Sequence, residues 1–362
     1  MHADDRLDWV ALSLIPGLSS ERLRLLLSRF GTPDRIFATP PSALATVVQE
    51  ALAHAISARR FDGAAVETTA RWLEDPVNHI ITLADPAYPR CLLEIADPPP
   101  LLYLKGDPAW LGRPGFAIVG SRHATVQGRR DAMAFAEALS RAGLCIVSGL
   151  AVGVDAAAHE GGLAGGGGSI AVVGTGLDIV YPAANRALAH RLAQEGLLLS
   201  EFPLGTPPRA QHFPRRNRLI SGLSRGVLVV EAAPRSGSLI TARLAAEQGR
   251  EVFAVPGSIH SPLSKGCHRL IKEGAKLVET AQDVVDELGV GASAAFPESA
   301  TQRAVSQEAE RCLRALGHAP LGLDGLVART GLTPERLSSI LLELELAGRV
   351  AVLPGGLYQA IF

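Results

Sequence analysis

The chain has 362 residues, of which 47% are hydrophobic and 20% charged, and its 35 basic and 36 acidic side chains leave a net charge of -1. This composition excludes a disordered chain and a protein that is basic along its whole length, and the length suits roughly two or three domains. Of the basic side chains, 31 are Arg and 4 are Lys. Codon bias in a GC-rich genome would explain that excess, whereas phosphate binding predicts that the arginines cluster.

The first 75 residues read as short helices. Apolar residues recur at helical spacing over 7–14 and again over 20–30, with Ser19 or Ser20 placed to cap the second helix. Two helices joined by a Pro-Gly-Leu turn resemble a helix-hairpin-helix unit, whose turn amides can meet a phosphate. An ordinary helical hairpin used for packing explains the same pattern, and we favour it. Residues 1–75 are therefore expected to form a small, all-helical, SAM-like domain.

From residue 76 to 288 the pattern predicts an α/β core. Prolines punctuate an entry segment, and apolar runs that do not alternate with polar residues then predict strands covered on both faces. Strands are expected at 116–119, 144–147, 170–173, 197–199, 227–230 and 252–255, and helices near 126–142, 154–164, 184–195, 214–224 and 238–248. Alternation of strands and helices predicts a Rossmann-like, doubly wound parallel sheet.

Residues 289–306 are rich in Gly, Ala and Ser and are expected to form a linker. The last segment, 307–362, predicts three helices and a hairpin, with Thr333 capping the third helix and Pro334 at its first position. This order resembles a winged-helix domain. Its third helix carries Glu335, Glu343 and Glu345 against Arg336, which favours a protein contact over insertion into a DNA groove.

Two further observations concern location and cofactors. The chain starts with an acidic segment rather than a secretory signal, and its most apolar uncharged stretch, 161–177, contains eight glycines and suits no membrane helix. The four cysteines are isolated, with no CxxC pair. We expect a cytoplasmic protein with no membrane segment, no metal and no cofactor.

Ligands of a doubly wound sheet bind at the carboxyl ends of its strands. There the sequence places a rim of glycines, hydroxyls and one arginine, which suits oxyanions better than proton transfer, although glycines in such loops can also be simple tight turns. No GxGxxG fingerprint of an NAD site is present. The candidate phosphate-binding residues of these three loops are Gly120, Ser121, Arg122, Ser148, Gly149, Gly153, Asp155, Gly174 and Gly176.

The arginines do cluster. The span 202–246 contains seven of them and a single acidic residue, Glu231. Arg215 and Arg218 are three apart at the start of a helix and share a face, where guanidinium forks suit a phosphate chain. Pairing with distant carboxylates is the alternative explanation. The candidates from this span, with one lysine further on, are Phe213, Arg215, Arg216, Asn217, Arg218, Ser236, Gly237, Ser238 and Lys265.

Long motifs at these residues resemble the DprA/Smf family, DNA-processing proteins of bacterial natural transformation. They are Gly-Ser-Arg at 120–122, SGLAVGVDAAAH at 148–159, GTGLD at 174–178, FPRRNRLISGLS at 213–224 and RSGSLITARLAAEQGREVFAVPG at 235–257. The resemblance is continuous from about residue 80 to 288 and is consistent with the flanking segments. It implies a Rossmann-like core that binds single-stranded DNA in a positive pocket, dimerises and helps load the recombinase RecA, without catalysing a reaction.

The chain departs from the family pattern at two positions. Val152 stands where relatives often have Lys or Arg, so one phosphate contact is in doubt, with Lys265 as a substitute. His268 replaces the usual asparagine, which puts the hydrogen bonding there in doubt. Tyr181 and Phe213 are candidate platforms for base stacking, with core packing as the alternative.

Three alternative functions match parts of the sequence. Asp155 and His159 are four apart on a helix and suggest acid/base chemistry, but no nucleophile accompanies them, and a polar pair that fixes the loop is favoured. A nucleotide-processing enzyme such as a phosphoribohydrolase would need a catalytic Glu beside a PGGxGT-type loop, which the sequence lacks. A protein-binding adaptor acting through the C-terminal unit is the third possibility.

Overall fold

The centre of the molecule is one mixed sheet. The computed structural model describes residues 3–290, 306–317, 320–353 and 355–360. Nine strands of this described part follow the order β1-β2-β6-β5-β4-β3-β7-β8-β9, parallel except for the β1–β2 and β2–β6 pairs. They are β1 (Asn78–Thr82), β2 (Leu101–Gly106), β3 (Gly115–Val119), β4 (Cys145–Ser148), β5 (Ser169–Val172), β6 (Leu197–Ser200), β7 (Ser224–Val229), β8 (Glu251–Ala254) and β9 (Lys276–Leu277).

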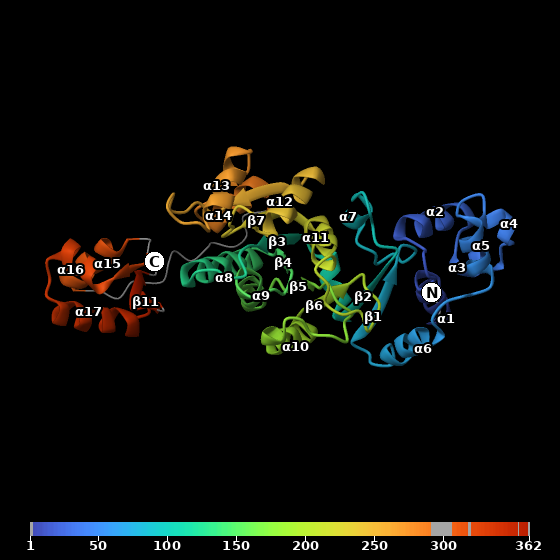
Figure 1. Cartoon of the computed structure of the whole chain (residues 1–362), viewed down its shortest axis with the longest axis horizontal. Helices are drawn as coiled ribbons and strands as arrows, with labels where there is room; N and C mark the ends of the chain where they lie inside the picture. Colours follow the sequence, from blue (N-terminus) through green and yellow to red (C-terminus); the bar gives the residue numbers. More distant parts are fainter. Residues whose placement is uncertain (1–2, 291–305, 318–319, 354, 361–362) are drawn as a thin grey trace.

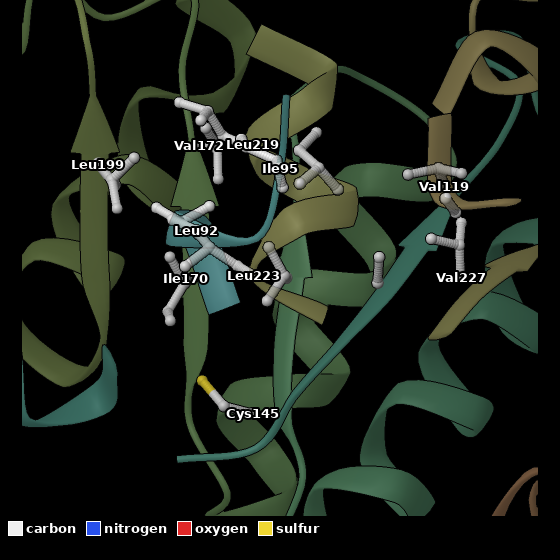
Figure 2. Close-up of a cluster of buried hydrophobic side chains, with 14 of the residues drawn as sticks. Leu92, Ile95, Val119, Cys145, Ile170, Val172, Leu199, Leu219, Leu223 and Val227 are labelled. Atoms are coloured by element: carbon white, nitrogen blue, oxygen red, sulfur yellow. The ribbon is translucent and has the colours of Figure 1, made fainter. Parts of the chain in front are cut away.

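Both faces of the sheet are covered by helices, as the non-alternating strands predict. Successive side chains of β3 point to opposite faces: Ala117 and Val119 join one core cluster, Phe116 and Ile118 the other. Figure 2 shows the first cluster, in which Leu92, Leu219 and Leu223 pack on the strands. The helices that flank the sheet are α7 (Arg90–Leu93), α8 (Val126–Arg141), α9 (Val154–Gly165), α10 (Arg186–Glu195), α11 (His212–Gly222), α12 (Ser238–Glu247), α13 (Lys265–Lys272) and α14 (Ala281–Leu288).

The N-terminal part is helical, as predicted, and lies at one end of the long axis in Figure 1. The Ser19 hydroxyl accepts a hydrogen bond from the Arg22 amide and caps α2, and Leu23 and Leu26 are buried in the local core. The Pro-Gly-Leu turn at 16–18 lies between the first two of these helices. The helices are α1 (Ala3–Ser13), α2 (Ser20–Phe30), α3 (Pro33–Ala38), α4 (Pro41–Leu44), α5 (Glu50–Ser57) and α6 (Gly63–Trp72).

The C-terminal part is a winged helix at the opposite end of the molecule (Figure 1). Thr333 accepts a hydrogen bond from the Arg336 amide and Pro334 is the first helical residue, as predicted. The predicted linker lies almost wholly outside the described residues. The elements are α15 (Gln307–Leu316), β10 (Leu321–Gly322), α16 (Leu323–Thr330), α17 (Pro334–Leu346), β11 (Val350–Leu353) and β12 (Leu357–Ala360).

The prediction of a doubly wound parallel core is confirmed, but the entry segment is more regular than expected. Its two strands, β1 and β2, extend the sheet as an antiparallel edge on β6. The prolines at 98–100 hid the strand β2 from sequence analysis. Its partner β6 lies about 95 residues further along the chain, so the pairing leaves no local signal. Among the described helices, none is long and apolar enough to cross a membrane.

Candidate nucleic-acid interface

The predicted loops meet at one edge of the sheet. Because β3, β4, β5 and β7 are parallel, their carboxyl ends lie on the same edge. β3 is flanked by β4 on one side and β7 on the other, so the chain reverses its direction of winding here. Open α/β sheets bind ligands outside the strands at such a switch point. The start of α11, which follows β6, lies at this edge as well.

A cation and two aromatic rings form the outer surface of the rim. The guanidinium carbon of Arg122 lies 5.5 Å from the centre of the Phe213 ring, and the rings of Phe213 and Tyr181 are 5.7 Å apart. Arg122 is exposed, and Tyr181 retains 44% of its accessible surface. Within the described residues, Arg122 forms no ion pair. A free guanidinium beside partly exposed rings is suited to a phosphate with a neighbouring base.

Arg215 and Arg218 share a face of α11, as predicted, but both contact a carboxylate that sequence reasoning did not consider. Glu201, whose side chain is 2% exposed, accepts hydrogen bonds from Arg218 at 2.7 Å and Arg215 at 3.0 Å. Arg218 is also bonded to Asp97 at 3.1 Å. The alternative of pairing with distant carboxylates therefore describes Arg218. Arg215 is half exposed, and its side chain remains open to an additional anion.

Arg216 is buried rather than displayed on the rim. It is 4% exposed, and its Nη1 donates hydrogen bonds to the carbonyls of Gly149, at 2.6 Å, and Val172. Burial lowers the pKa of Arg216 to about 10, with Asp155 opposing this shift and Arg122 adding to it. The geometry does not favour direct phosphate binding by Arg216, a candidate from the sequence, because the side chain is buried and its Nη1 already holds two backbone carbonyls.

The loop after β4 is held by buried polar side chains. The Asp155 carboxylate accepts hydrogen bonds from the amides of Gly149 and Ala151, at 3.2 and 3.3 Å. His159 Nε2 accepts a hydrogen bond from the Leu150 amide at 3.2 Å. Leu150 has a φ of 58°, a backbone conformation that residues other than glycine rarely adopt. Asp155 therefore fixes the loop through two amides and His159 through a third, which agrees with the loop-fixing role that the sequence favoured.

The remaining predicted residues differ in accessibility. Ser121 is largely buried and accepts a hydrogen bond from the His123 amide, and Ser148 donates one to the Ile118 carbonyl. The hydroxyls of Ser236 and Ser238 are 2.7 Å apart at the start of α12, where Asn217 reaches the Gly237 carbonyl at 3.5 Å. Gly120, Gly174 and Gly176 are packed against other protein atoms, and Gly153 has a φ of 85°.

Lys265 is the predicted phosphate-binding residue that lies away from the other candidates. Lys265 lines a separate hollow with Ile259 and Leu277, and no other predicted rim residue lines that hollow. In the same hollow, His268 donates a hydrogen bond to the Gly257 carbonyl at 2.9 Å. The histidine that replaces the usual asparagine thus has a backbone partner. Direct phosphate contact by Lys265 stays a prediction that the geometry does not favour.

Two carboxylates support the site in ways that the sequence did not predict: Glu201 was not considered, and Glu231 was noted without a role. Glu201 directly follows β6, and Glu231 follows β7, where it accepts hydrogen bonds from the amide and hydroxyl of Thr125 and so supports the start of α8. The signal that could have found both is their position, since each is the first or second residue after a parallel strand.

The burial of His159 predicts a pH-dependent stability. Burial lowers the pKa of His159 to about 3, from 6.5 in the unfolded chain, so between these values the unfolded state binds more protons than the folded state. Stability from this group is complete above pH 6.5 and is lost as the pH falls below it. From pH 7 to 5 we expect a loss of about 2 kcal/mol. Urea unfolding of the wild type and of His159→Gln, which does not titrate, measures the difference; equal losses in both proteins would contradict the assignment.

Comparison with known proteins places this geometry in context. A model of the family described as DNA recombination-mediator protein A matches residues 79–289, and a model of the DprA winged helix domain matches 296–356. Protein Smf of Escherichia coli is 44% identical over 303 residues, which cover 82% of this chain and 81% of that protein. DNA processing protein DprA of Streptococcus pneumoniae is 52% identical over 206 residues, 57% of this chain and 73% of the relative.

Solved structures agree with the sequence comparisons. The X-ray structure of DNA processing protein A from Streptococcus pneumoniae superposes with a TM-score of 0.69 at 41% identity, covering 78% of this chain and 97% of that one. The DNA processing protein A of Helicobacter pylori, studied for its single-stranded DNA binding mode, superposes with a TM-score of 0.53 at 33% identity, covering 58% of this chain and 95% of that one.

Proposed function

Because the chain belongs to the DNA recombination-mediator protein A family, we propose that it binds single-stranded DNA at the rim of its sheet, protects incoming strands and helps to load RecA onto them during natural transformation. The observation that carries the DNA-binding part is the exposed Arg122 beside Phe213 and Tyr181 at the carboxyl edge of the strands. The Helicobacter pylori relative, which has a single-stranded DNA binding mode, supports the same ligand.

In this proposal the rim recognises the backbone and the flat faces of bases rather than a sequence. Arg122 and Arg215 contact phosphates, and Phe213 and Tyr181 offer surfaces for stacking, which every base can use. We do not infer recognition of base edges in a groove of double-stranded DNA, because the cations and rings lie around short loops at a sheet edge. The protein is accordingly expected to tolerate different sequences.

The proposal assigns no chemical step to the site. Asp155 and His159, the pair that suggested acid/base catalysis, each hold a backbone amide, and burial keeps His159 neutral because it lowers its pKa. Their positions support binding rather than turnover. Release of a free base from a nucleoside monophosphate by the purified protein would overturn this part of the proposal.

The test of DNA binding is a titration of fluorescent oligo-dT at several salt concentrations. Affinity should fall steeply with salt, since each neutralised phosphate of a single strand contributes a slope of about −0.7 in the plot of log K against log salt. An affinity that does not change with salt would contradict a phosphate-binding rim. For the RecA part, the protein should speed RecA assembly on strands already coated by a single-strand binding protein, and no acceleration would remove that part alone.

We further propose that the chain forms a homodimer through the α13 face. There Ile259 and Leu277 are 66% and 46% exposed beside a hollow of about 580 Å³ that Ile271 also lines. Large exposed apolar side chains grouped at one hollow mark an interaction surface. Leu277→Glu should convert a dimer of the 38.0 kDa chain into a monomer in light scattering. Leu346→Glu, at another exposed apolar residue, is the control, and a dimer that survives Leu277→Glu would exclude this face.

We also propose that the chain divides into a helical domain (1–75), a core (76–288), a linker (289–306) and a winged helix (307–362). The protein is proposed to act in the cytoplasm, where RecA and its DNA are found. Arg336 of α17 pairs with Glu308 at 2.5 Å, so the helix presents Glu335, Glu343 and Glu345 without a compensating free arginine of its own. This charge supports a protein-binding role for the winged helix. Oligo-dT affinity unchanged by Glu343→Lys would agree with it, and a clear gain or loss would not.

A further inference from the structure

We propose that Arg216 is a positioning residue, which shapes the loop after β4 from beneath so that the rim can receive a phosphate chain, and that it does not itself contact DNA. This inference rests on the proposed function, because it concerns the same site. An arginine in a cluster of arginines is ordinarily expected to contact phosphate directly, and the role proposed here differs from that.

The contacts of Arg216 tie two strand ends together. Its Nη1 bridges the carbonyl of Gly149, which follows β4, and the carbonyl of Val172, the last residue of β5. A β-carbon at Gly149 would lie 2.6 Å from the guanidinium, so the loop fits over the arginine only because this residue has no side chain. One buried guanidinium nitrogen therefore links the ends of two paired strands beneath the rim.

Asp155 holds the same segment of backbone from the other side. Its carboxylate accepts hydrogen bonds from the Gly149 and Ala151 amides, whereas the Gly149 carbonyl accepts from Arg216. Both polar groups of Gly149 are thus bonded to buried, oppositely charged side chains. An uncompensated charge buried to this extent would be costly, and the carboxylate offsets it.

A direct contact between Arg216 and DNA conflicts with this arrangement. The side chain is 4% exposed, its Nη1 is held by two backbone carbonyls and its Nε is buried without a hydrogen-bond partner, so little of the guanidinium is open to the surface. The neighbouring Arg122 is exposed and occupies the outer position. Positive charge at the rim is therefore divided between an outer cation that can reach a phosphate and an inner one that holds the loop.

A lysine substitution distinguishes a positioning role of Arg216 from direct contact with phosphate. A lysine keeps the charge, but its side chain is about one bond shorter and lacks the planar guanidinium, so its ammonium cannot take the position from which Nη1 bridges the two carbonyls. If Arg216 contacted phosphate through its charge, Arg216→Lys would retain most of the affinity. If it positions the loop, Arg216→Lys should lower the affinity for oligo-dT by about tenfold to a hundredfold, because displacement of a binding group by about 1 Å has effects of that size.

The experiment is the salt titration of oligo-dT binding with matched variants. For Arg216→Lys we expect weaker binding at every salt concentration and the slope of the wild type. Arg122→Ala should reduce the slope by about 0.7, the contribution of one phosphate. Arg225→Lys, at an exposed arginine near the start of β7 on the opposite edge, should change neither quantity. Wild-type affinity in Arg216→Lys, or a slope reduced by one phosphate, would overturn the inference.

A second readout does not depend on DNA. Amide hydrogen exchange of residues 149–153 should accelerate in Arg216→Lys, while α8 exchanges as in the wild type. If Arg216→Lys does not fold, Gly149→Ala moves the guanidinium without removing it and should have the same effect on affinity and exchange. If the wild type binds no oligo-dT, the proposed function fails. In that case the amide hydrogen exchange of residues 149–153 in Arg216→Lys still tests the positioning role, and exchange as slow as in the wild type would contradict it.

Discussion

Replacing both Arg122 and Arg215 by alanine is expected to lower the affinity for single-stranded DNA by at least about a hundredfold, since each hydrogen bond between charged groups contributes about 1.5–3 kcal/mol. Arg122 has no carboxylate partner among the described residues, and Arg215 is half exposed although it touches Glu201. The slope of log K against log salt should fall by about 1.4, which corresponds to two phosphates.

The control for this variant removes the same charge elsewhere. Arg191 of α10 and Arg225 of β7 are exposed and lie outside the rim, so Arg191→Ala with Arg225→Ala changes the net charge equally. We expect this control to alter affinity only slightly, through the overall field. Equal losses in the two double variants would show that net charge, rather than the rim, determines binding, and would contradict the proposed site.

The fold was accessible from local patterns because each element carried its own signal. Buried parallel strands read as short apolar runs, and the predicted helices at 184–195 and 214–224 correspond to α10 (Arg186–Glu195) and α11 (His212–Gly222). Capping by Ser19 and Thr333 was read from single residues. What local patterns could not provide was β2, whose place on β6 depends on pairing with a distant segment.

The site was predicted less completely, for a comparable reason. The loops were located correctly, since the carboxyl ends of parallel strands must meet at one edge. The role of each arginine could not be read from the sequence, because it depends on which side of α11 faces the sheet. Arg216 points inward to Gly149, and Arg218 reaches Glu201, which lies directly before the acid-poor span 202–246.

Glu201 is expected to be the side chain whose loss destabilises this edge most. Glu201→Ala should lower the free energy of unfolding by about 3 kcal/mol, because removing one partner of a buried ion pair leaves the other charge uncompensated. Arg218 is 11% exposed and donates two hydrogen bonds to this carboxylate, at 2.7 and 2.8 Å. Its contact with Asp97 persists in the variant and keeps the loss below the upper end of the range for buried pairs.

Chemical denaturation of Glu201→Ala and of Glu195→Ala separates this effect from the loss of any carboxylate. Glu195 pairs with Arg191 at the surface, where both side chains are about half exposed, so its removal should cost less than about 1 kcal/mol. In Glu201→Ala the stability of the protein and its affinity for oligo-dT should then change in opposite directions. Without Glu201, Arg215 loses a competing anion, so the folded variant should bind oligo-dT more tightly than the wild type although it is less stable. A stable variant with unchanged affinity would contradict both the ion pair and the place of Arg215 in the site.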